Sequence, residues 1–475
     1  TVSVLYWFSP RAMRRVLAAS VLALFAVFAA ALDNGAGMTP PVGWSTWCAD
    51  GRCGLDYCSE PQVKESAQVL LDSGLHALGY TWVVLDDCWA AGQRTANGSI
   101  TWDPERFPSG IPALTKWLHD RNMSFGLYTS MGNTTCDKGG RPYPIPGSEG
   151  HYQQDANTFA SWNVDYVKAD WCGDVKKLPL DGIMVGAKDY INISHAINNT
   201  VPKRSIYLEG VAAMLFLWGD VKTYMNAWRA STDHHDNWMN LMEVVATVQV
   251  AGIPGSPGAW SDMDVLMTGG QGCPNHRGPD GHFSNNDTAH CPGMTDDEYV
   301  TEFTLWNMMQ SPLLVSTDIR NMTAIMRKIL FNKRFIDMNQ DTRTPPGRHI
   351  GGDSTCGYGL GSITCQLWAR PLADGSVFVA LFNAELEPTV HSVNITLDFA
   401  KFAKHLPSGW GADTAVKVED LWNPTAAWRT VTGAYTSPML APHAVNAVVL
   451  HPVSSTASGD AHNNNGHTVR RAGRH

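Results

Sequence analysis

Two charged residues stand at the end of a segment that otherwise has the composition of a buried strand. The stretch VDYVKADWC, residues 164–172, places Lys168 and Asp170 two positions apart, so both side chains point to the same face of a strand. A carboxylate beside an ammonium group keeps a low pKa and stays ionised, as a nucleophile must. Taken alone, the pair is also compatible with a buried ion pair that has no catalytic role.

A second carboxylate favours the catalytic interpretation. Asp233 follows Arg229 by four residues in WRASTDHHDNW, at the end of another predicted strand. Two carboxyl groups that face each other across a pocket, one ionised and one able to carry a proton, are the minimum apparatus for cleaving a glycosidic bond. The DHHD sequence is the competing sign of a metal site, but no HExxH or comparable ligand spacing accompanies it. We therefore expect acid–base chemistry without a metal or another cofactor.

Further polar and aromatic residues could hold a sugar. Asp86 and Asp87 are adjacent at a predicted strand end and can accept hydrogen bonds from neighbouring hydroxyl groups. Trp47, Trp89 and Tyr128 can pack against the apolar face of a sugar ring. Core packing is the alternative for these aromatic residues, and it is the favoured one for Trp89.

Short apolar runs alternate with amphipathic stretches from about residue 40 to residue 340. This order is typical of a parallel sheet that helices cover on both faces. Strand-like runs lie at 81–89, 123–130, 164–171 and 204–211. Helical spacing of apolar residues lies at 61–75, 111–121 and 236–250.

The residues at the strand ends favour a closed (β/α)8 TIM barrel over an open doubly wound sheet. In a closed barrel the carboxyl ends of all strands ring one mouth, where such enzymes place their chemistry. An open sheet that binds a nucleotide should carry a glycine-rich loop, and no GxGxxG or GxxxxGK[ST] follows any early strand. We predict the barrel over residues 33–343, with these residues at its mouth: Trp47, Asp86, Asp87, Tyr128, Lys168, Asp170, Glu209, Arg229, Asp233 and Asp264.

The sequence changes character after MNQD at 338–341. Alternating strand-like runs and tight turns follow, and residues 364–383 predict a β-hairpin about Ala-Asp-Gly. We predict a smaller antiparallel β-sandwich over 344–453, with structural support favoured over sugar binding as its role. Residues 454–475 lack apolar periodicity and predict a disordered tail.

The amino-terminal segment and the cysteines predict a secretory route. The apolar run Val16–Leu32 follows arginines and ends in small residues, so we assign residues 1–32 to a signal peptide and residues upstream of it, with a membrane anchor as the alternative. Ten cysteines and several Asn-x-Ser/Thr triplets agree with an oxidising, glycosylating compartment, although free thiols or a zinc site are alternatives for the cysteines. We expect a secreted, lysosomal or vacuolar protein.

Charge and hydropathy exclude two classes of partner. The net charge of −9 comes without a cluster of basic residues, so a nucleic acid is not expected as a partner. No stable membrane span is expected after cleavage of the signal, since no second long apolar run follows. A homodimer stays open.

These motifs together resemble glycoside hydrolase family 27, the melibiase or α-galactosidase family, which also includes α-N-acetylgalactosaminidases. The resembling segments occur in order from about residue 39 to residue 371. They include TPPVGWSTWC, LDDCWA, FGLYTSMGNTTC, VDYVKADWC, WRASTD and WSDMDVL. The family has a (β/α)8 barrel followed by an antiparallel β domain, so the resemblance implies the same arrangement here.

The resemblance also implies a function and a role for each residue. The expected activity is that of a retaining exo-α-galactosidase, with Asp170 as the nucleophile and Asp233 as the general acid/base of a two-step displacement. Lys168 and Arg229 resemble cations that contact the ligand beside them. The resemblance implies that Asp86 and Asp87 hold the 4- and 6-hydroxyls of the sugar. It implies further substrate contacts from these residues: Trp47, Tyr128, Cys136, Glu209 and Asp264.

Cysteine spacing suggests the disulfides Cys136–Cys172, Cys273–Cys291 and Cys356–Cys365. The resemblance implies that the Cys136–Cys172 bond pins two loops of the active site. It also implies the amino-terminal disulfides Cys48–Cys88 and Cys53–Cys58.

The chain departs from the family pattern at the fifth predicted strand. Many α-galactosidases carry a CEW-like stretch there, whose glutamate contacts the 2-hydroxyl and excludes an N-acetyl group. Here the chain reads SIYLEGVAAM, and Glu209 lies two positions early. An α-N-acetylgalactosaminidase and a β-L-arabinopyranosidase are therefore alternatives, although Asp86 and Asp87 favour a sugar with a 6-hydroxyl. A galactose-binding protein without catalysis is the alternative from another class.

Overall fold

The structure, a computed structural model, describes residues 32, 34–49, 58–136, 144–173, 183–211, 221–269, 293–353, 364–385 and 391–453. The predicted signal peptide, apart from Leu32, and the predicted tail at 454–475 lie outside these residues. Within the described ranges, none of the helices combines the length and the apolar character needed to cross a bilayer.

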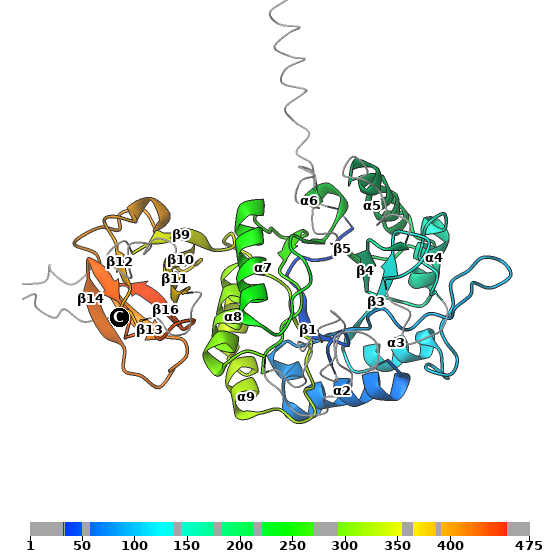
Figure 1. Cartoon of the computed structure of the whole chain (residues 1–475), viewed down its shortest axis with the longest axis horizontal. Helices are drawn as coiled ribbons and strands as arrows, with labels where there is room; N and C mark the ends of the chain where they lie inside the picture. Colours follow the sequence, from blue (N-terminus) through cyan, green and yellow to red (C-terminus); the bar gives the residue numbers. More distant parts are fainter. Residues whose placement is uncertain are drawn as a thin grey trace, which may run out of the picture.

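Eight parallel strands form the predicted barrel, which Figure 1 shows down its axis. The sheet order is β7-β6-β5-β4-β3-β2-β1-β8, and a parallel bridge between Leu266 and Val315 closes the ring between β7 and β8. The strands are β1 (Val42–Ser45), β2 (Trp82–Val84), β3 (Ser124–Ser130), β4 (Tyr166–Asp170), β5 (Tyr207–Val211), β6 (Ala227–Arg229), β7 (Trp260–Asp262) and β8 (Leu313–Val315).

Helices surround the barrel on its outer side. They are α2 (Glu60–Ser73), α3 (Ile111–His119), α4 (Tyr152–Ser161), α5 (Ile183–Asn198), α6 (Val221–Tyr224), α7 (Trp238–Ala251), α8 (Asp296–Met308), α9 (Ala324–Leu330) and α10 (Lys333–Gln340). The ends of α7 show why the helix forms where the sequence predicts it. The Asn237 side chain caps the start by accepting from the Asn240 N–H, and Gly252 ends it in a left-handed conformation.

The barrel requires a glycine where its first two strands meet. A Cβ atom at Gly43 in β1 would lie 2.0 Å from the backbone oxygen of Trp82 in β2. This distance is far inside van der Waals contact, so only glycine allows the strands to approach as closely as they do.

The carboxyl-terminal domain consists of two antiparallel sheets. A six-stranded sheet has the order β14-β13-β16-β11-β10-β9, and a two-stranded sheet joins β12 and β15. The predicted hairpin is β10 paired with β11, with Cys365 opposite Asn383. The strands are β9 (Arg348–Gly352), β10 (Cys365–Pro371), β11 (Val377–Asn383), β12 (Thr396–Asp398), β13 (Ala415–Asp420), β14 (Arg429–Thr432), β15 (Ala434–Thr436) and β16 (Val445–Pro452).

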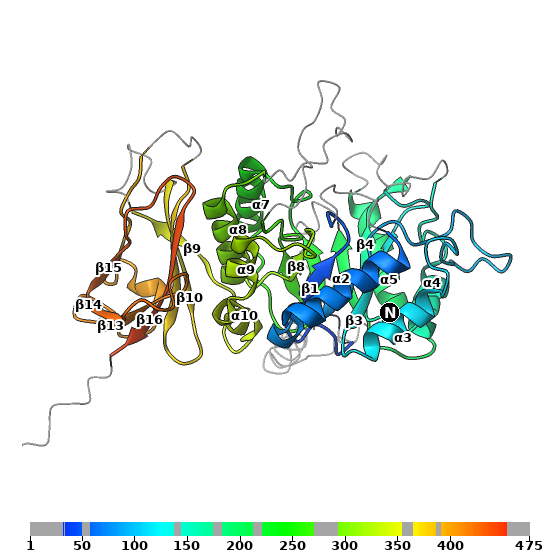
Figure 2. The same cartoon turned by 90° about the horizontal axis from the view of Figure 1, so that it is seen from below.

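The larger sheet lies beside the helices of the barrel (Figure 2), and its central strand β11 is buried on both faces. In β11, Phe378 and Phe382 belong to the hydrophobic core shared with the barrel. Val379 and Leu381, which alternate with them, pack in the separate core of the sandwich. Two buried faces explain why β11 is a continuous apolar run rather than an alternating one.

Helix α8 joins the two domains. Every residue from Glu298 to Met308 is buried. The Thr301 hydroxyl donates to the backbone oxygen of His443 at 2.7 Å, and the Trp422 indole donates to the Thr304 hydroxyl at 3.0 Å. The helix therefore carries polar side chains on buried faces, and residues of the sandwich bond to Thr301 and Thr304.

The amino-terminal disulfides differ from the expected ones. Cys88 is bonded to Cys58, with 6.0 Å between their Cα atoms, so both Cys48–Cys88 and Cys53–Cys58 are wrong. The physical reason is the start of α2, where the Glu60 N–H donates to the backbone oxygen of Arg106 and brings Cys58 beside the loop after β2. Cys48 is also disulfide-bonded.

The remaining expected disulfides fall partly outside the described residues. Cys53, Cys273, Cys291 and Cys356 lie outside them. Cys365 is disulfide-bonded, and Cys136 is bonded to Cys172. The cysteines of the described ranges include no free thiol.

Candidate active site

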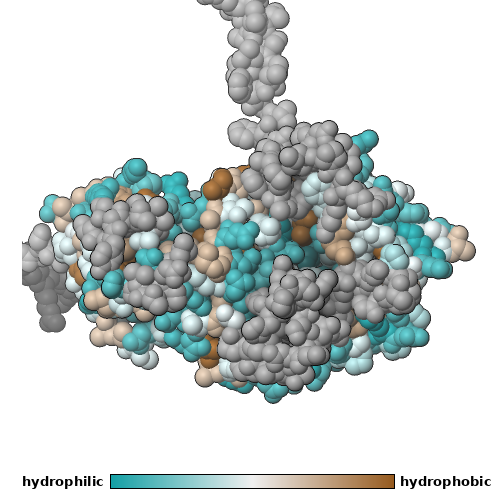
Figure 3. All heavy atoms as spheres, in the orientation of Figure 1, coloured by the Kyte–Doolittle hydropathy of each residue, from teal (hydrophilic) through white to brown (hydrophobic). Residues whose placement is uncertain are grey.

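The carboxyl ends of the strands bring most of the predicted residues to one end of the barrel. The strand register places Lys168 level with Glu209, and Asp170 level with Val211 one step nearer the mouth. Figure 3 shows hydrophilic side chains around a hollow over the barrel. The arrangement has the polar mouth that a (β/α)8 barrel uses for chemistry.

Asp170 ends β4, and two donors fix its carboxylate. The Tyr128 hydroxyl donates to Oδ2 at 2.7 Å, and the Trp171 backbone N–H donates to Oδ1 at 2.7 Å. Burial raises the pKa of Asp170 above its ordinary 3.8, although Lys168 and Tyr128 act to lower it. The expectation that the neighbouring ammonium keeps this pKa low is therefore wrong, because loss of hydration outweighs the charge of Lys168.

A disulfide lies directly against Asp170. The Cys136 sulfur is 3.0 Å from Asp170 Oδ2, and it is bonded to Cys172. Ligand-type atoms of these three residues lie within 4.8 Å of one another. Because both sulfurs are spent in the disulfide, neither is a thiolate, and the cluster does not fit a metal ion.

Lys168 forms a buried ion pair with Asp86. Their side chains approach to 2.7 Å, with 10% and 4% of the side-chain surface exposed. Burial acts to lower the pKa of Lys168, but Asp86 and other carboxylates raise it above 10.5, so the ammonium stays charged. The aromatic rings of Trp47 and Tyr128 face this ammonium, with centroids at 5.4 and 5.7 Å.

Asp86 and Asp87 lie just beyond β2 and are both buried. The Asp86 N–H donates to the Thr46 hydroxyl at 2.9 Å, and the Asp87 N–H donates to Asp86 Oδ1 at 2.8 Å. These bonds fix the backbone of both residues beside the Lys168 ammonium. Two acceptor groups are thereby held at one place on the mouth.

Arg229 ends β6 and binds two carboxylates. Its guanidinium is 2.9 Å from Asp264 and 3.1 Å from Asp233. The Arg229 side chain is 1% exposed, whereas that of Asp233 is 55% exposed. Burial acts to raise the pKa of Asp233, but Arg229 and Lys168 more than offset it and bring the pKa below 3.8. The Asp233 carboxylate also acts to raise the pKa of Asp170.

Asp264 is held in an unusual backbone conformation. Its φ of 75° lies in the left-handed region, which is costly for a residue other than glycine. Its Oδ2 accepts from the His234 N–H at 2.7 Å, its backbone oxygen accepts from the Trp306 indole at 2.8 Å, and its N–H donates to Asp262 at 2.8 Å. These contacts aim the Asp264 carboxylate at Arg229.

The Glu209 carboxyl group is bonded to neighbouring side chains of the barrel. Glu209 lies level with Lys168, one step deeper than Asp170, and its carboxyl group bonds to the Tyr166 hydroxyl and to Asp262. Val211 occupies the position level with Asp170. The glutamate therefore stands at the depth of Lys168, and its carboxyl group bonds to protein partners.

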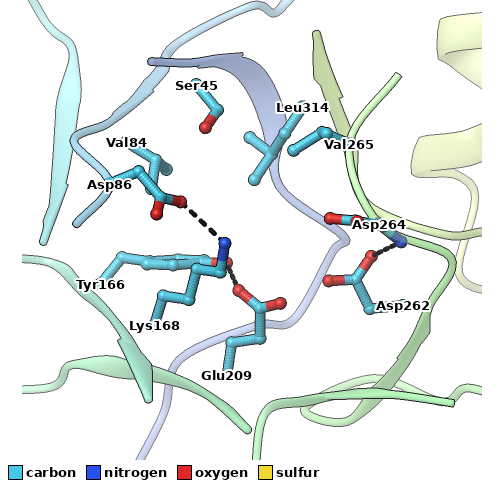
Figure 4. Close-up of a pocket in the computed structure, with 10 residues that line it drawn as sticks. All are labelled: Ser45, Val84, Asp86, Tyr166, Lys168, Glu209, Asp262, Asp264, Val265 and Leu314. Carbon is cyan, nitrogen blue, oxygen red and sulfur yellow. Dashed lines mark hydrogen bonds and ion pairs between the residues drawn. The ribbon is translucent and has the colours of Figure 1, made fainter. Parts of the chain in front are cut away.

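A small enclosed cavity lies among these deeper residues (Figure 4). Its volume of about 10 Å³ is near the minimum for one water molecule, so it is part of the barrel interior and no sugar fits in it. The lining includes Asp86, Lys168, Glu209, Asp262 and Asp264. The cavity therefore lies among the inward-facing side chains of the barrel, next to the residues predicted for its mouth.

Sequence reasoning missed Asp262 and Tyr166. Asp262 stands two residues before Asp264 in WSDMDVL, the same spacing that identified Lys168 and Asp170. That spacing could have identified Asp262 as a second charged residue on the same strand face. Tyr166 offers no comparable signal, because an aromatic residue at the start of a buried strand is usual in a core.

The fold and its mouth define the chain as a (β/α)8 protein with clustered carboxylates at the carboxyl ends of its strands. Its sequence matches the family model described as alpha galactosidase A over residues 39–279 and 278–341. Residues 363–450 match the model described as the alpha galactosidase C-terminal beta sandwich domain. The chain belongs to the alpha galactosidase A family, within glycoside hydrolase family 27.

Similarity to known proteins extends over most of the chain. The chain is 31% identical to alpha-galactosidase of Cyamopsis tetragonoloba, covering 89% of this chain and 88% of the relative. It is 32% identical to alpha-galactosidase 3 of Arabidopsis thaliana, covering 89% and 84%. The solved structure of alpha-galactosidase I from Mortierella vinacea superposes with a TM-score of 0.71 at 25% identity, covering 88% of this chain and 98% of that one.

Proposed function

We propose that the protein is a retaining exo-α-galactosidase that hydrolyses terminal α-D-galactosyl residues. Asp170 is the nucleophile, and Asp233 is the general acid/base. The observation that carries the proposal is the pair of carboxylates at one barrel mouth, one fixed on β4 and one exposed beside Arg229, in a chain of this family.

In the first step the Asp170 carboxylate attacks the anomeric carbon, and Asp233 gives its proton to the departing glycosidic oxygen. A covalent galactosyl ester on Asp170 results. In the second step Asp233 takes a proton from a water molecule, whose oxygen attacks the anomeric carbon and releases Asp170. Galactose leaves with its original anomeric configuration.

The remaining residues bind and orient the sugar. Asp86 and Asp87 accept from its 4- and 6-hydroxyls, and the Lys168 ammonium between aromatic rings donates to its oxygens. Their support is the fixed geometry of the Lys168–Asp86 pair, with 2.7 Å between charged atoms. Trp47 and Tyr128 provide the aromatic wall, and Arg229 holds Asp233. Cys136 contributes a sulfur beside the nucleophile. Glu209 is assigned no sugar contact.

The activity is tested with an aryl α-D-galactoside over a range of pH. Turnover needs an ionised Asp170 and a protonated Asp233, so kcat/KM should be bell-shaped. Because loss of the Asp233 proton stops the first step, the optimum should be acidic. Asp170→Asn should lower kcat at least about a thousand-fold while the melting temperature stays near that of wild type. Proton NMR of the first product should show α-galactose. Wild-type turnover by Asp170→Asn, or β-galactose as the first product, contradicts the proposal.

Substrate preference is tested with a matched panel. The α-galactoside should give a higher kcat/KM than the β-L-arabinopyranoside, because Asp86 and Asp87 are proposed to hold the 4- and 6-hydroxyls and the arabinopyranoside lacks the 6-hydroxymethyl group. It should also give a higher kcat/KM than the α-N-acetylgalactosaminide, since the similar proteins named above are alpha-galactosidases. Preference for either other glycoside would replace the assigned substrate. Binding of galactose without turnover of any glycoside would identify a binding protein.

We infer that the protein matures in the secretory pathway. The Cys58–Cys88 and Cys136–Cys172 disulfides support this route, because such bonds persist in oxidising compartments. Expression of the full chain in a eukaryotic host should yield active, disulfide-bonded enzyme in the medium or in an acidic organelle. A homodimer is checked in the same preparation by light scattering.

A further inference from the structure

Two carboxyl groups meet inside the barrel, one step beneath the mouth. Glu209 projects from β5 and Asp262 from β7, and their side chains are in hydrogen-bond contact. Figure 4 shows them turned toward each other. Glu209 is 3% exposed and Asp262 is 4% exposed. The proposed mechanism uses neither group.

The contact requires a proton. Two ionised carboxylates cannot share a hydrogen bond, and in a buried site their repulsion is not screened by water. The nearby cations are engaged elsewhere, since Lys168 pairs with Asp86 at 2.7 Å and Arg229 with Asp264 at 2.9 Å. The pair must therefore hold one proton to be stable.

The surrounding donors place this proton on Glu209. One Glu209 oxygen accepts from the Tyr166 hydroxyl, which leaves its other oxygen to carry the proton toward Asp262. Asp262 Oδ1 accepts from the Asp264 N–H at 2.8 Å, as an ionised carboxylate does best. Glu209 is thus the donor, and Asp262 is the acceptor of both bonds.

A chain of contacts leads from this pair to the acid/base residue. Asp262 accepts from the Asp264 N–H and supports its left-handed backbone. The Asp264 carboxylate holds Arg229 at 2.9 Å, and Arg229 holds Asp233 at 3.1 Å. If Glu209 and Asp262 separate, the hydrogen bond from the Asp264 N–H to Asp262 loses its support.

We propose that Glu209 is a positioning residue that must remain a carboxylic acid, because its proton joins β5 to β7 and anchors the Asp264–Arg229–Asp233 chain. The role in catalysis rests on the function proposed above. Deprotonation at high pH sets two like charges against each other, so the anchor acts as a pH-sensitive latch beneath the site.

The direction of the pH effect follows from linkage. Burial, with Asp262, raises the pKa of Glu209 well above 4.5, and burial raises that of Asp262 above 3.8. A folded-state pKa above the unfolded one means that stability is present below the unfolded pKa and is lost as pH rises through the folded pKa. The charged and titratable groups that act on the pair come from β4, α5, β5, β6 and the loop after β7: Tyr166, Lys168, Tyr190, Tyr207, Arg229 and Asp264.

The first test compares wild type with Glu209→Gln. The amide keeps a donor for Asp262 and an acceptor for Tyr166, so kcat/KM at the acidic optimum should stay within about threefold of wild type. Because the amide cannot lose a proton, the fall in melting temperature as the pH rises through the folded-state pKa of Glu209 should shrink to about half or less. The alkaline limb of the kcat/KM profile should also move to higher pH.

The control is Glu60→Gln, which removes another buried carboxyl group, bonded to Lys64 and Ser109. The pKa of Glu60 is lowered, so its loss should leave the alkaline fall in melting temperature unchanged. An unchanged alkaline fall in Glu209→Gln, or a loss of acidic activity beyond about a hundredfold, overturns the proposal, since the latter would mean that the carboxyl group itself acts in the reaction.

The second test needs no variant. Neutron diffraction from crystals of the deuterated wild-type protein at the pH of the acidic optimum should show a deuterium on Glu209 directed at Asp262. Two bare carboxylates, or a deuterium on Asp262, overturn the assignment. Melting and diffraction do not require turnover, so a protein that shows the latch but cleaves no galactoside would refute the proposed function and leave the latch standing.

Discussion

At the scale of single residues, the Lys168–Asp86 ion pair is the clearest case of buried charge that is proposed to serve substrate binding rather than stability. Both side chains are buried, and a buried ion pair seldom adds net stability over apolar residues of the same size. Its retention at the mouth is explained by the sugar it is proposed to bind. The pair therefore predicts separate effects on folding and on activity.

Lys168→Met should leave Asp86 buried without its cation, which should cost about 3 to 5 kcal/mol of unfolding free energy and lower kcat/KM at least about a hundredfold. Urea unfolding and turnover of the aryl galactoside measure the two effects. The double variant Lys168→Met with Asp86→Asn should regain stability but not activity.

The matched control is Lys116→Met, which breaks an exposed pair with Asp120 whose side chains are 74% and 54% exposed. It should cost less than about 1 kcal/mol and leave activity unchanged. Equal losses in Lys168→Met and Lys116→Met would contradict the importance given to the buried pair.

Residue spacing predicted the face of a strand better than the depth along it. The two-residue spacing of Lys168 and Asp170 correctly placed both on the inner face, because side chains alternate along a strand. Glu209 also faces inward, but the neighbouring register, which the sequence does not reveal, sets it level with Lys168 and within reach of Tyr166 and Asp262. The prediction of the amino-terminal disulfides was wrong for a similar reason. Four nearby cysteines allow several pairings, and the packing of α2 selects among them.

At the scale of elements, the contact of β1 with β2 depends on one missing side chain. Gly43→Ala would push a Cβ atom to 2.0 Å from the Trp82 oxygen, and backbone atoms on both sides cannot yield. We expect a loss of about 3 kcal/mol or more, at the upper end of overpacking, with a matching drop in melting temperature.

Gly411→Ala is the control for this substitution. An added Cβ atom at Gly411 meets nothing within 4 Å, so stability should change by less than about 0.5 kcal/mol. A Gly43→Ala protein as stable as Gly411→Ala would show that the barrel tolerates a wider spacing of its first two strands.

At the scale of the whole molecule, the two domains meet through a buried stack. The His443 ring lies 3.9 Å from that of Trp238 in α7, and its Nδ1 bonds to Glu298 in α8. His443→Ala should therefore lower the unfolding free energy by about 2 to 4 kcal/mol while kcat stays unchanged, because these groups lie outside the mouth.

His451→Ala is the matched control, since His451 stacks on the exposed Trp428 at 4.8 Å within the sandwich alone. It should cost less than about 1 kcal/mol. Calorimetry of both variants, with turnover measured in parallel, decides the matter. A fall in kcat for His443→Ala would mean that the domain contact shapes the mouth.

The order of elements along the chain was enough to predict both architectures. Alternating strands and helices indicated the barrel, and the hairpin of β10 and β11 indicated the antiparallel domain. The packing of one domain on the other was not predictable, because α8 has no single apolar face and reads as neither a surface helix nor a core helix.

Helix α8 is buried between the barrel and the sandwich, from Glu298 to Met308. Its backbone amide hydrogens can exchange with solvent deuterium only when the barrel and the sandwich separate. Their exchange should therefore be among the slowest in the molecule. A truncation to the barrel alone would remove the sandwich and expose apolar helix and strand faces to solvent. We expect such a fragment to aggregate. The sandwich thus supports the galactoside site from a distance by keeping the barrel soluble.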